Sequence, residues 1–174
     1  MVQDIEVWFS EGLSVGSIQP GAQTCIKDVT FKNVQMHTPI RGIYVKTARA
    51  EKGTGLIQNI TYENFNIQKP LLWGIYVGPL QDGGKGGKGC LHYPFSKNCV
   101  VESKVTVTDI MLKNITVVDG LLPAGILLCN ATNPCTGLDF EDVHVHTPLW
   151  DIMKQGYFVS NAQGTENDDF PLPF

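Results

Sequence analysis

The sequence predicts an all-β chain that winds into a parallel β-helix of about five coils. One observation is a repeat with a period of roughly 24 to 31 residues, which is typical of solenoids. A second is that apolar residues alternate within each copy and are often β-branched or aromatic, which excludes a helical solenoid. A third is an Asn or Asp in each main copy, where the alternation breaks.

Each copy supplies two short apolar runs, a bend between them and a third strand led by glycine. The clearest copy spans residues 28–47, with further copies in 59–77, 109–128 and 138–159 and a partial copy in 5–15. The residues at the bend are Asn33, Asn64, Asn114 and Asp142. Because Asn and Asp tolerate a left-handed backbone best, we expect a turn there in every coil. Stacked coils would join these side chains into a hydrogen-bonded ladder.

Length and composition favour a single β-helix domain over residues 1–174, because 174 residues that are 43% hydrophobic can bury one sizeable core. Residues 81–105 interrupt the period as an inserted loop, and residues 162–174 form a polar tail that we expect to pack across the final coil. The repeat begins within a few residues of Met1, so the first coil has no cover. End-to-end stacking on another subunit or a longer chain would explain this open end.

Net charge, apolar run length and cysteine spacing argue against several kinds of partner. A formal net charge of −4 gives no reason to expect nucleic acid, and no apolar run approaches the ~18 residues of a membrane span. No cysteine spacing fits a zinc site, so we expect neither a metal nor a cofactor. His144 and His146 alternate on one strand and could bind a metal, but we interpret them as surface histidines.

Cysteines and glycosylation sequons point outside the cell. Cys90 with Cys99, and Cys129 with Cys135, each close a short loop as predicted disulfides, which leaves Cys25 alone. Three sequons begin at Asn59, Asn114 and Asn130. A chain rich in Asn and Thr also produces sequons by chance. We nevertheless expect a secreted or cell-wall protein, although the chain contains no signal peptide.

Aligning the glycine-led strands places residues from different coils in columns about 4.8 Å apart. The inward column is expected to hold Leu13, Ile43, Ile75, Ile126 and Tyr157, and the outward column Ser14, Tyr44, Tyr76, Leu127 and Phe158. The column before the glycines holds Glu11, Arg41, Trp73, Ala124 and Gln155.

One outer face would therefore present Glu11, Arg41, Tyr44, Trp73 and Tyr76, with Lys46 nearby. Aromatic faces stack on sugar rings, and Arg or Lys can bind a carboxylate, so this face is a candidate sugar-binding site. The alternative from spacing alone is a solvated ion pair beside a packed aromatic ladder.

Three segments carry a resemblance to a known family. Residues 10–17 read SEGLSVGS and residues 42–47 read GIYVKT. They resemble the Gly-His-Gly-Leu/Ile-Ser-Ile-Gly-Ser and Gly-Val-Arg-Ile-Lys-Thr motifs of the glycoside hydrolase family that contains the polygalacturonases. Residues 125–143, with a Cys-to-Pro-Cys loop between two strands, resemble its plant-like C-terminal pattern. The resemblance implies a right-handed parallel β-helix and covers only the C-terminal half of a typical member.

The resemblance implies inverting hydrolysis of galacturonan-type bonds by Asp residues that act as acid and base. Those Asp motifs lie upstream of the first matching segment, so this chain does not contain them. Glu11 replaces the motif His and Tyr44 replaces the motif Arg, whereas Lys46 matches a substrate-binding position. Glu11 is thus the one candidate catalytic residue, and Lys46, Arg41, Tyr44, Trp73 and Tyr76 are candidate substrate-binding residues.

Two functions remain open from the sequence. The first is a polygalacturonase-like hydrolase that acts on pectin or galacturonan-type polysaccharide, as a fragment or degenerate member with weak or no activity alone. The second is a non-catalytic carbohydrate-binding or adhesive β-helix that uses the same face. A calcium-dependent pectate lyase shares the architecture but needs a cluster of acidic ligands on one face, which we do not find in the sequence.

Overall fold

The structure, a computed structural model, describes residues 1–49, 52–80, 93, 99, 101–148, 152 and 156–174. The described residues form eleven strands, so the chain is all-β as predicted. Nothing in the described part of the chain is a helix long and apolar enough to cross a membrane.

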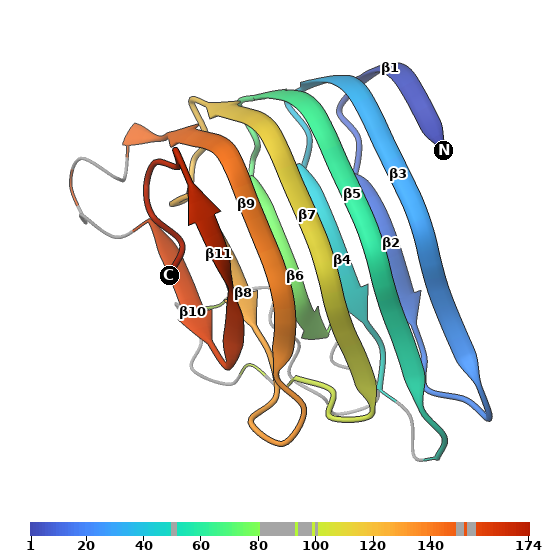
Figure 1. The fold of residues 1–174 in the computed structure, drawn as a ribbon. Coiled ribbons are helices and arrows are strands. Elements are labelled where there is room, and N and C mark those ends of the chain that lie inside the picture. Colours follow the sequence, from blue (N-terminus) through green and yellow to red (C-terminus); the bar gives the residue numbers. More distant parts are fainter. Residues whose placement is uncertain (50–51, 81–92, 94–98, 100, 149–151, 153–155) are drawn as a thin grey trace.

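The strands alternate between two parallel sheets, which makes a right-handed parallel β-helix (Figure 1). Sheet A has the order β1-β3-β5-β7-β9-β11, with bounds Val2–Trp8, Thr24–His37, Gly55–Gln68, Val105–Val118, Cys135–His146 and Ala162–Asn167. Sheet B has the order β10-β8-β6-β4-β2, with bounds Tyr157–Ser160, Gly125–Leu128, Ile75–Leu80, Ile43–Thr47 and Leu13–Ile18. Five pairs of strands thus supply the five expected coils, and β11 begins another turn.

The long strands of sheet A bend at the predicted residues. Asn33, Asn64 and Asn114 have φ angles of 57°, 59° and 51°, and Asp142 has 58°. Asn64 Nδ2 donates to Asn33 Oδ1 at 2.9 Å, and Asn114 Nδ2 donates to Asn64 Oδ1 at 2.9 Å. Asn33 continues the ladder to Asp4 Oδ1 at 2.8 Å. The expected ladder of bend residues is therefore confirmed for the Asn members.

A second bend was not expected from the sequence. Asp28, Asn59 and Asp109 have φ angles of 60°, 55° and 56°, and Asn59 Nδ2 donates to Asp28 Oδ1 at 2.7 Å. In β5 the buried side chains restart after each of its two bends, at Ile60 and at Phe65. Each left-handed residue adds one position to the alternation, so the apolar side chains keep pointing inward.

The main core lies between the two sheets, and a smaller one lies on the outer face of sheet B. The small core contains Tyr44, Trp73, Tyr76, Ile126 and Leu128. It is covered by partly buried side chains of the turns, of β10 and of the predicted insertion: Leu72, Tyr93, Cys99, Val101, Leu122 and Phe158. Most of the predicted inserted loop, 81–105, lies outside the described residues.

The predicted column through the fourth coil is wrong by one residue. Gly125 pairs with Ile75, and Ile126 pairs with Tyr76, so Ala124 occupies the position expected for Gly125. As a result Leu127 belongs to the main core, whereas Ile126 and Leu128 belong to the outer one. Tyr157, which pairs with Gly125, does point inward as expected.

The two ends of the coil stack differ. At the C-terminal end, β11 pairs with β9, and the Phe170 backbone exchanges hydrogen bonds with Val143 and Val145 at 2.9 and 2.7 Å. The tail therefore lies across the last coil, as expected. At the N-terminal end, β1 is mostly exposed, and Trp8 and Phe9 are 57% and 76% exposed.

Candidate functional site

The predicted site residues gather on the outer face of sheet B. Parallel register aligns Ser14 with Tyr44 and Tyr44 with Tyr76. The residues before these strands are aligned by backbone bonds from Leu13 N to Gly42 O at 3.0 Å and from Gly42 N to Trp73 O at 3.2 Å. The structure therefore brings the residues of three successive coils together, as the column alignment predicted.

Arg41 is the most enclosed charged group of this face. Its Nη1 lies 3.4 Å from Glu11 Oε2, and its Cζ lies 4.6 Å and 5.3 Å from the ring centres of Tyr44 and Tyr76. The Arg41 side chain is 6% exposed, whereas that of Glu11 is 65% exposed. Arg41 is thus held between two aromatic rings, and the carboxylate that pairs with it faces solvent.

Lys46 approaches the same tyrosine from the end of β4. Its Nζ lies 4.6 Å from the centre of the Tyr44 ring, and the residue is partly buried. Burial lowers the pKa of Lys46, the charge of Glu11 opposes that change, and the charge of Arg41 adds to it. Lys46 is therefore a partly desolvated cation beside an exposed carboxylate.

The aromatic residues of the site do not form an open platform. Tyr44 and Tyr76 are each 1% exposed and meet edge to face at 4.9 Å, and Trp73 is fully buried beneath Phe158 at 5.8 Å. Their side chains point away from the main core as predicted, but the small outer core covers them. Burial raises the pKa of Tyr76 well above its ordinary value. Of the six predicted residues, Glu11 and Lys46 are the two that reach solvent appreciably.

Tyr93 is a residue of this region that sequence reasoning missed. Its ring meets Phe158 edge to face at 5.7 Å, and it packs on the small outer core. Because it lies in the insertion, where the repeat is interrupted, no column alignment could place it.

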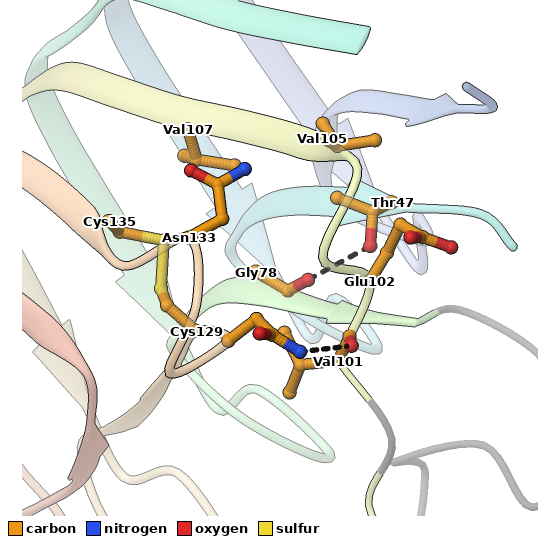
Figure 2. A pocket seen from close by; sticks show the side chains of 10 residues that line it. Thr47, Gly78, Val101, Glu102, Val105, Val107, Cys129, Asn133 and Cys135 are labelled. Carbon is orange, nitrogen blue, oxygen red and sulfur yellow. Dashed lines mark hydrogen bonds between the residues drawn. A yellow bond between two sulfur atoms is a disulfide. The ribbon is translucent and has the colours of Figure 1, made fainter. Parts of the chain in front are cut away.

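A crevice beside the site is filled by structural contacts (Figure 2). Thr47 Oγ1 donates to Gly78 O at 3.0 Å, and Asn130 Nδ2 donates to Val101 O at 3.2 Å. The Cys129–Cys135 disulfide lines the same crevice. These bonds fix the ends of β4, β6 and β8, and thereby hold the backbone that carries Lys46.

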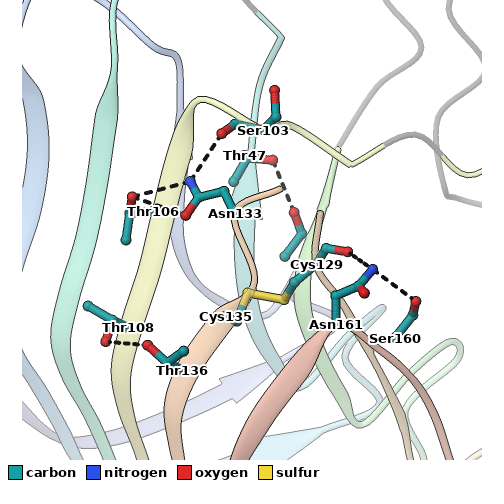
Figure 3. The surroundings of a disulfide bond; sticks show 11 residues. Thr47, Ser103, Thr106, Thr108, Cys129, Asn133, Cys135, Thr136, Ser160 and Asn161 are labelled. Carbon is teal, nitrogen blue, oxygen red and sulfur yellow. Dashed lines mark hydrogen bonds between the residues drawn. A yellow bond between two sulfur atoms is a disulfide. The ribbon is translucent and has the colours of Figure 1, made fainter. Parts of the chain in front are cut away.

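The predicted Cys129–Cys135 disulfide is confirmed, with the two Cα atoms 5.6 Å apart (Figure 3). Cys99 is also disulfide-bonded, and its predicted partner Cys90 lies outside the described residues. Cys25 is free and exposed. No predicted pairing is contradicted.

The three sequon asparagines already make hydrogen bonds through Nδ2, the atom that a glycan would occupy. Asn59 and Asn114 are exposed members of the bend ladders, and Asn130 is half-buried. Asn130 Oδ1 also accepts from the Thr132 amide at 2.9 Å. Glycosylation of these residues remains a prediction.

The sequence predicted no metal site, but the described part of the chain contains one cluster of possible metal ligands. Ligand atoms of Asp142, His144 and Asp168 all lie within 4.8 Å of one another, and His144 Nε2 lies 2.9 Å from Asp142 Oδ1. Asp142 and His144 lie on β9 of sheet A, in the last coils, whereas Glu11 precedes β2 of sheet B in the first coil. His146 instead stacks on Phe170 at 5.5 Å.

Comparison with known proteins gives a consistent result. Residues 2–162 match the glycosyl hydrolases family 28. An exopolygalacturonase of Zea mays is 32% identical over 139 residues, which cover 77% of this chain and 30% of that protein. A polygalacturonase of Medicago sativa is 25% identical over 146 residues, which cover 82% of this chain and 31% of that protein. Endopolygalacturonase II of Aspergillus niger is 26% identical over 147 residues, which cover 80% and 37%. The chain thus spans about a third of the length of these relatives.

Proposed function

Since the chain belongs to glycosyl hydrolases family 28, we propose that it supplies the substrate-binding wall of a polygalacturonase-like hydrolase that acts on pectin or galacturonan-type polysaccharide. The observation that carries the proposal is Lys46, a partly buried cation at the rim of the aromatic cluster on sheet B. A galacturonan presents a carboxylate on every unesterified sugar, so it matches a site that offers an ammonium group.

The surroundings of Lys46 strengthen a contact with a carboxylate. A charge-assisted hydrogen bond is roughly twice as strong as a neutral one, and partial exclusion of water increases the attraction further. The Tyr44 ring lies 4.6 Å from Lys46 Nζ and limits the positions that the ammonium group can adopt. Lys46 is therefore better placed to bind a uronate than an ordinary surface lysine.

The same face explains why the chain alone should cleave little or nothing. Inverting glycosidases need an acid and a base whose carboxyl groups lie about 6.5–9.5 Å apart. Among the described residues, Glu11 is the carboxylate that acts on Lys46. One carboxylate that is already paired with Arg41 does not supply both roles.

A second candidate function follows from the pairing of Glu11 with Arg41. A non-catalytic carbohydrate-binding or adhesive protein would retain Lys46 and the aromatic cluster and would need no acid–base pair. Both functions predict binding of the polysaccharide, but the hydrolase also predicts its cleavage.

The test measures retention on polygalacturonate by affinity electrophoresis together with release of reducing ends. We expect the chain to be retained, Lys46→Ala to weaken retention, and Lys27→Ala, which removes an equal charge from sheet A, to leave it unchanged. The same assay on a form extended by residues encoded upstream of Met1 separates the candidates. Release by the extended form supports the hydrolase, and retention without release by both forms supports the binding protein. No retention of the chain, or equal loss in both lysine variants, contradicts the proposal.

Export and glycosylation belong to the same proposal. The Cys129–Cys135 disulfide favours an oxidising compartment, which agrees with a secreted or cell-wall location. Glycans at Asn59, Asn114 and Asn130 would be detected as a mass decrease after enzymatic deglycosylation of the protein from its natural source. An unmodified mass would contradict this part of the proposal.

End-to-end stacking of the first coil on a second copy of this chain is a further proposal, and continuation of the coils in a longer chain is the alternative. Trp8 and Phe9 are solvent-exposed there, and β1 leaves a strand edge unpaired. Because the tail covers the other end, the contact would join two N-terminal coils. Sedimentation should show a dimer that Trp8→Ser weakens; a monomer at all concentrations would contradict stacking.

A further inference from the structure

Two cations lie against the ring of Tyr44, and one of them is paired with an exposed carboxylate. Arg41 Cζ and Lys46 Nζ each lie 4.6 Å from the centre of the Tyr44 ring, so the two cations are at most about 9 Å apart. Glu11 Oε2 lies 3.4 Å from Arg41 and is the exposed member of that pair. The carboxylate of Glu11 and the ammonium group of Lys46 are therefore close enough for one short oligosaccharide to contact both.

The position of Arg41 decides which charge a ligand meets first. The guanidinium lies between the rings of Tyr44 and Tyr76 and is almost fully buried. It is thus poorly placed to bind a ligand carboxylate directly, although its residue type suggests that role. At this point of the surface the accessible group is the Glu11 carboxylate.

A carboxylate and an ammonium group select different partners. An ionised carboxylate has no proton to donate, so Glu11 accepts hydrogen bonds from sugar hydroxyl groups and repels another carboxylate. Lys46 donates hydrogen bonds and attracts a carboxylate. The pair therefore distinguishes an acidic sugar from its neighbour along the polysaccharide.

We propose that Glu11 is a specificity-determining residue, and that this site takes a uronate at Lys46 beside a sugar without a free carboxylate at Glu11. The sugar at Glu11 is neutral or carries its carboxyl group as an ester. The substrate class is then a partly esterified or mixed acidic and neutral galacturonan, in preference to a fully de-esterified one. This inference rests on the proposed function, since it requires a galacturonan-type chain on the same surface.

The expected size of the preference follows from Coulomb's law. Two like charges about 4 Å apart in water-like surroundings reduce affinity by about fivefold, and the positive charge of Arg41, 3.4 Å from Glu11, offsets part of this repulsion. Salt weakens the repulsion, because the Debye length shortens to about 8 Å at physiological ionic strength. We therefore expect a preference of about 2-fold to 5-fold for the partly esterified ligand at low salt.

The experiment measures dissociation constants by titration calorimetry for two oligogalacturonides of equal length, one fully de-esterified and one partly methyl-esterified. The variants are Glu11→Gln, which keeps the shape and removes the charge, and Lys46→Met. Glu6→Gln is the matched control, because Glu6 is an exposed acid of the same coil on sheet A.

The proposal expects the wild type and Glu6→Gln to prefer the esterified ligand. Glu11→Gln should remove most of that preference by strengthening binding of the de-esterified ligand, and Lys46→Met should weaken both ligands. Equal binding of both ligands by the wild type, with loss in Lys46→Met, overturns the role of Glu11 and leaves the proposed function standing. An unchanged preference in Glu11→Gln also overturns the role of Glu11 and leaves the proposed function standing. Absence of binding to either ligand overturns both proposals.

Discussion

The bend ladder of sheet A gives a stability prediction that can be worked from its geometry. Asn64 has a left-handed φ of 59°, donates to Asn33 and accepts from Asn114, each at 2.9 Å. Asn64→Ala removes both hydrogen bonds, at about 0.5–1.5 kcal/mol each. It also places a Cβ residue without a local polar group in the left-handed region, at about 1 kcal/mol. The free energy of unfolding should therefore fall by about 2–4 kcal/mol.

Two further variants separate these contributions. Asn64→Gly loses the same hydrogen bonds but adopts the left-handed backbone freely, so it should be about 1 kcal/mol more stable than Asn64→Ala. Asn66→Ala is the control on the same strand, outside the ladder, and should change stability by about 0.5 kcal/mol or less. Urea unfolding followed by tryptophan fluorescence, to which buried Trp73 contributes, measures all three. A loss below about 0.5 kcal/mol for Asn64→Ala, or a glycine variant less stable than the alanine variant, would refute the ladder's role.

Three other predictions concern the strands that carry the site. Because burial lowers the pKa of Lys46, its ammonium group should lose its proton, and the protein its affinity for an oligogalacturonide, at a lower pH than an ordinary lysine would. Lys46→Arg should keep its affinity over the same pH range, and identical pH profiles for the two proteins would contradict this. Gly42→Ala should destabilise the fold by about 1–3 kcal/mol, since its Cβ would lie 2.5 Å from the Gly74 oxygen, and a variant as stable as the wild type in urea would show that the coils are less tightly stacked. Cys129→Ser should cost about 2 kcal/mol, as expected for a cross-link between residues six apart, and a change below about 0.5 kcal/mol in thermal unfolding would argue against that contribution.

The sequence predicts the repeat well because each coil must place small, apolar and bend residues at fixed positions. The bend at Asn64 and the glycine strand led by Gly42 are visible since only a few residue types suit a left-handed backbone or a close approach. The second bend was missed because the repeat was aligned from Asp28, Asn59 and Asp109 onward, and the apolar residues before them did not enter the comparison.

The register of the fourth coil shows a different limit. Ala124 and Gly125 are adjacent small residues, and either could begin the strand. A side chain at Gly125 would meet the Ile75 oxygen and the Tyr157 ring, because an added Cβ would lie 2.5 Å from that oxygen and 3.0 Å from Tyr157 Cε1. That choice depends on contacts between coils, which a single sequence does not reveal.

The sequence predicted the proximity of the candidate residues, but it predicted their exposure to solvent only in part. Glu11, Arg41, Tyr44 and Lys46 meet as expected, because strand register alone brings them together. Burial of the tyrosines depends on covering side chains such as Tyr93, which belongs to a segment without periodicity. An outward direction on a strand therefore did not imply contact with solvent.

The most direct test of uronate binding by Lys46 is a cycle of four dissociation constants at low salt. Wild type and Lys46→Ala are each titrated with an acidic oligogalacturonide and with a neutral galactose oligomer of the same length. Binding through Lys46 predicts a loss of about 10-fold or more for the acidic ligand and less than about 2-fold for the neutral one, because a hydrogen bond to a charged group contributes about 1.5–3 kcal/mol. Equal losses for the two ligands would contradict it.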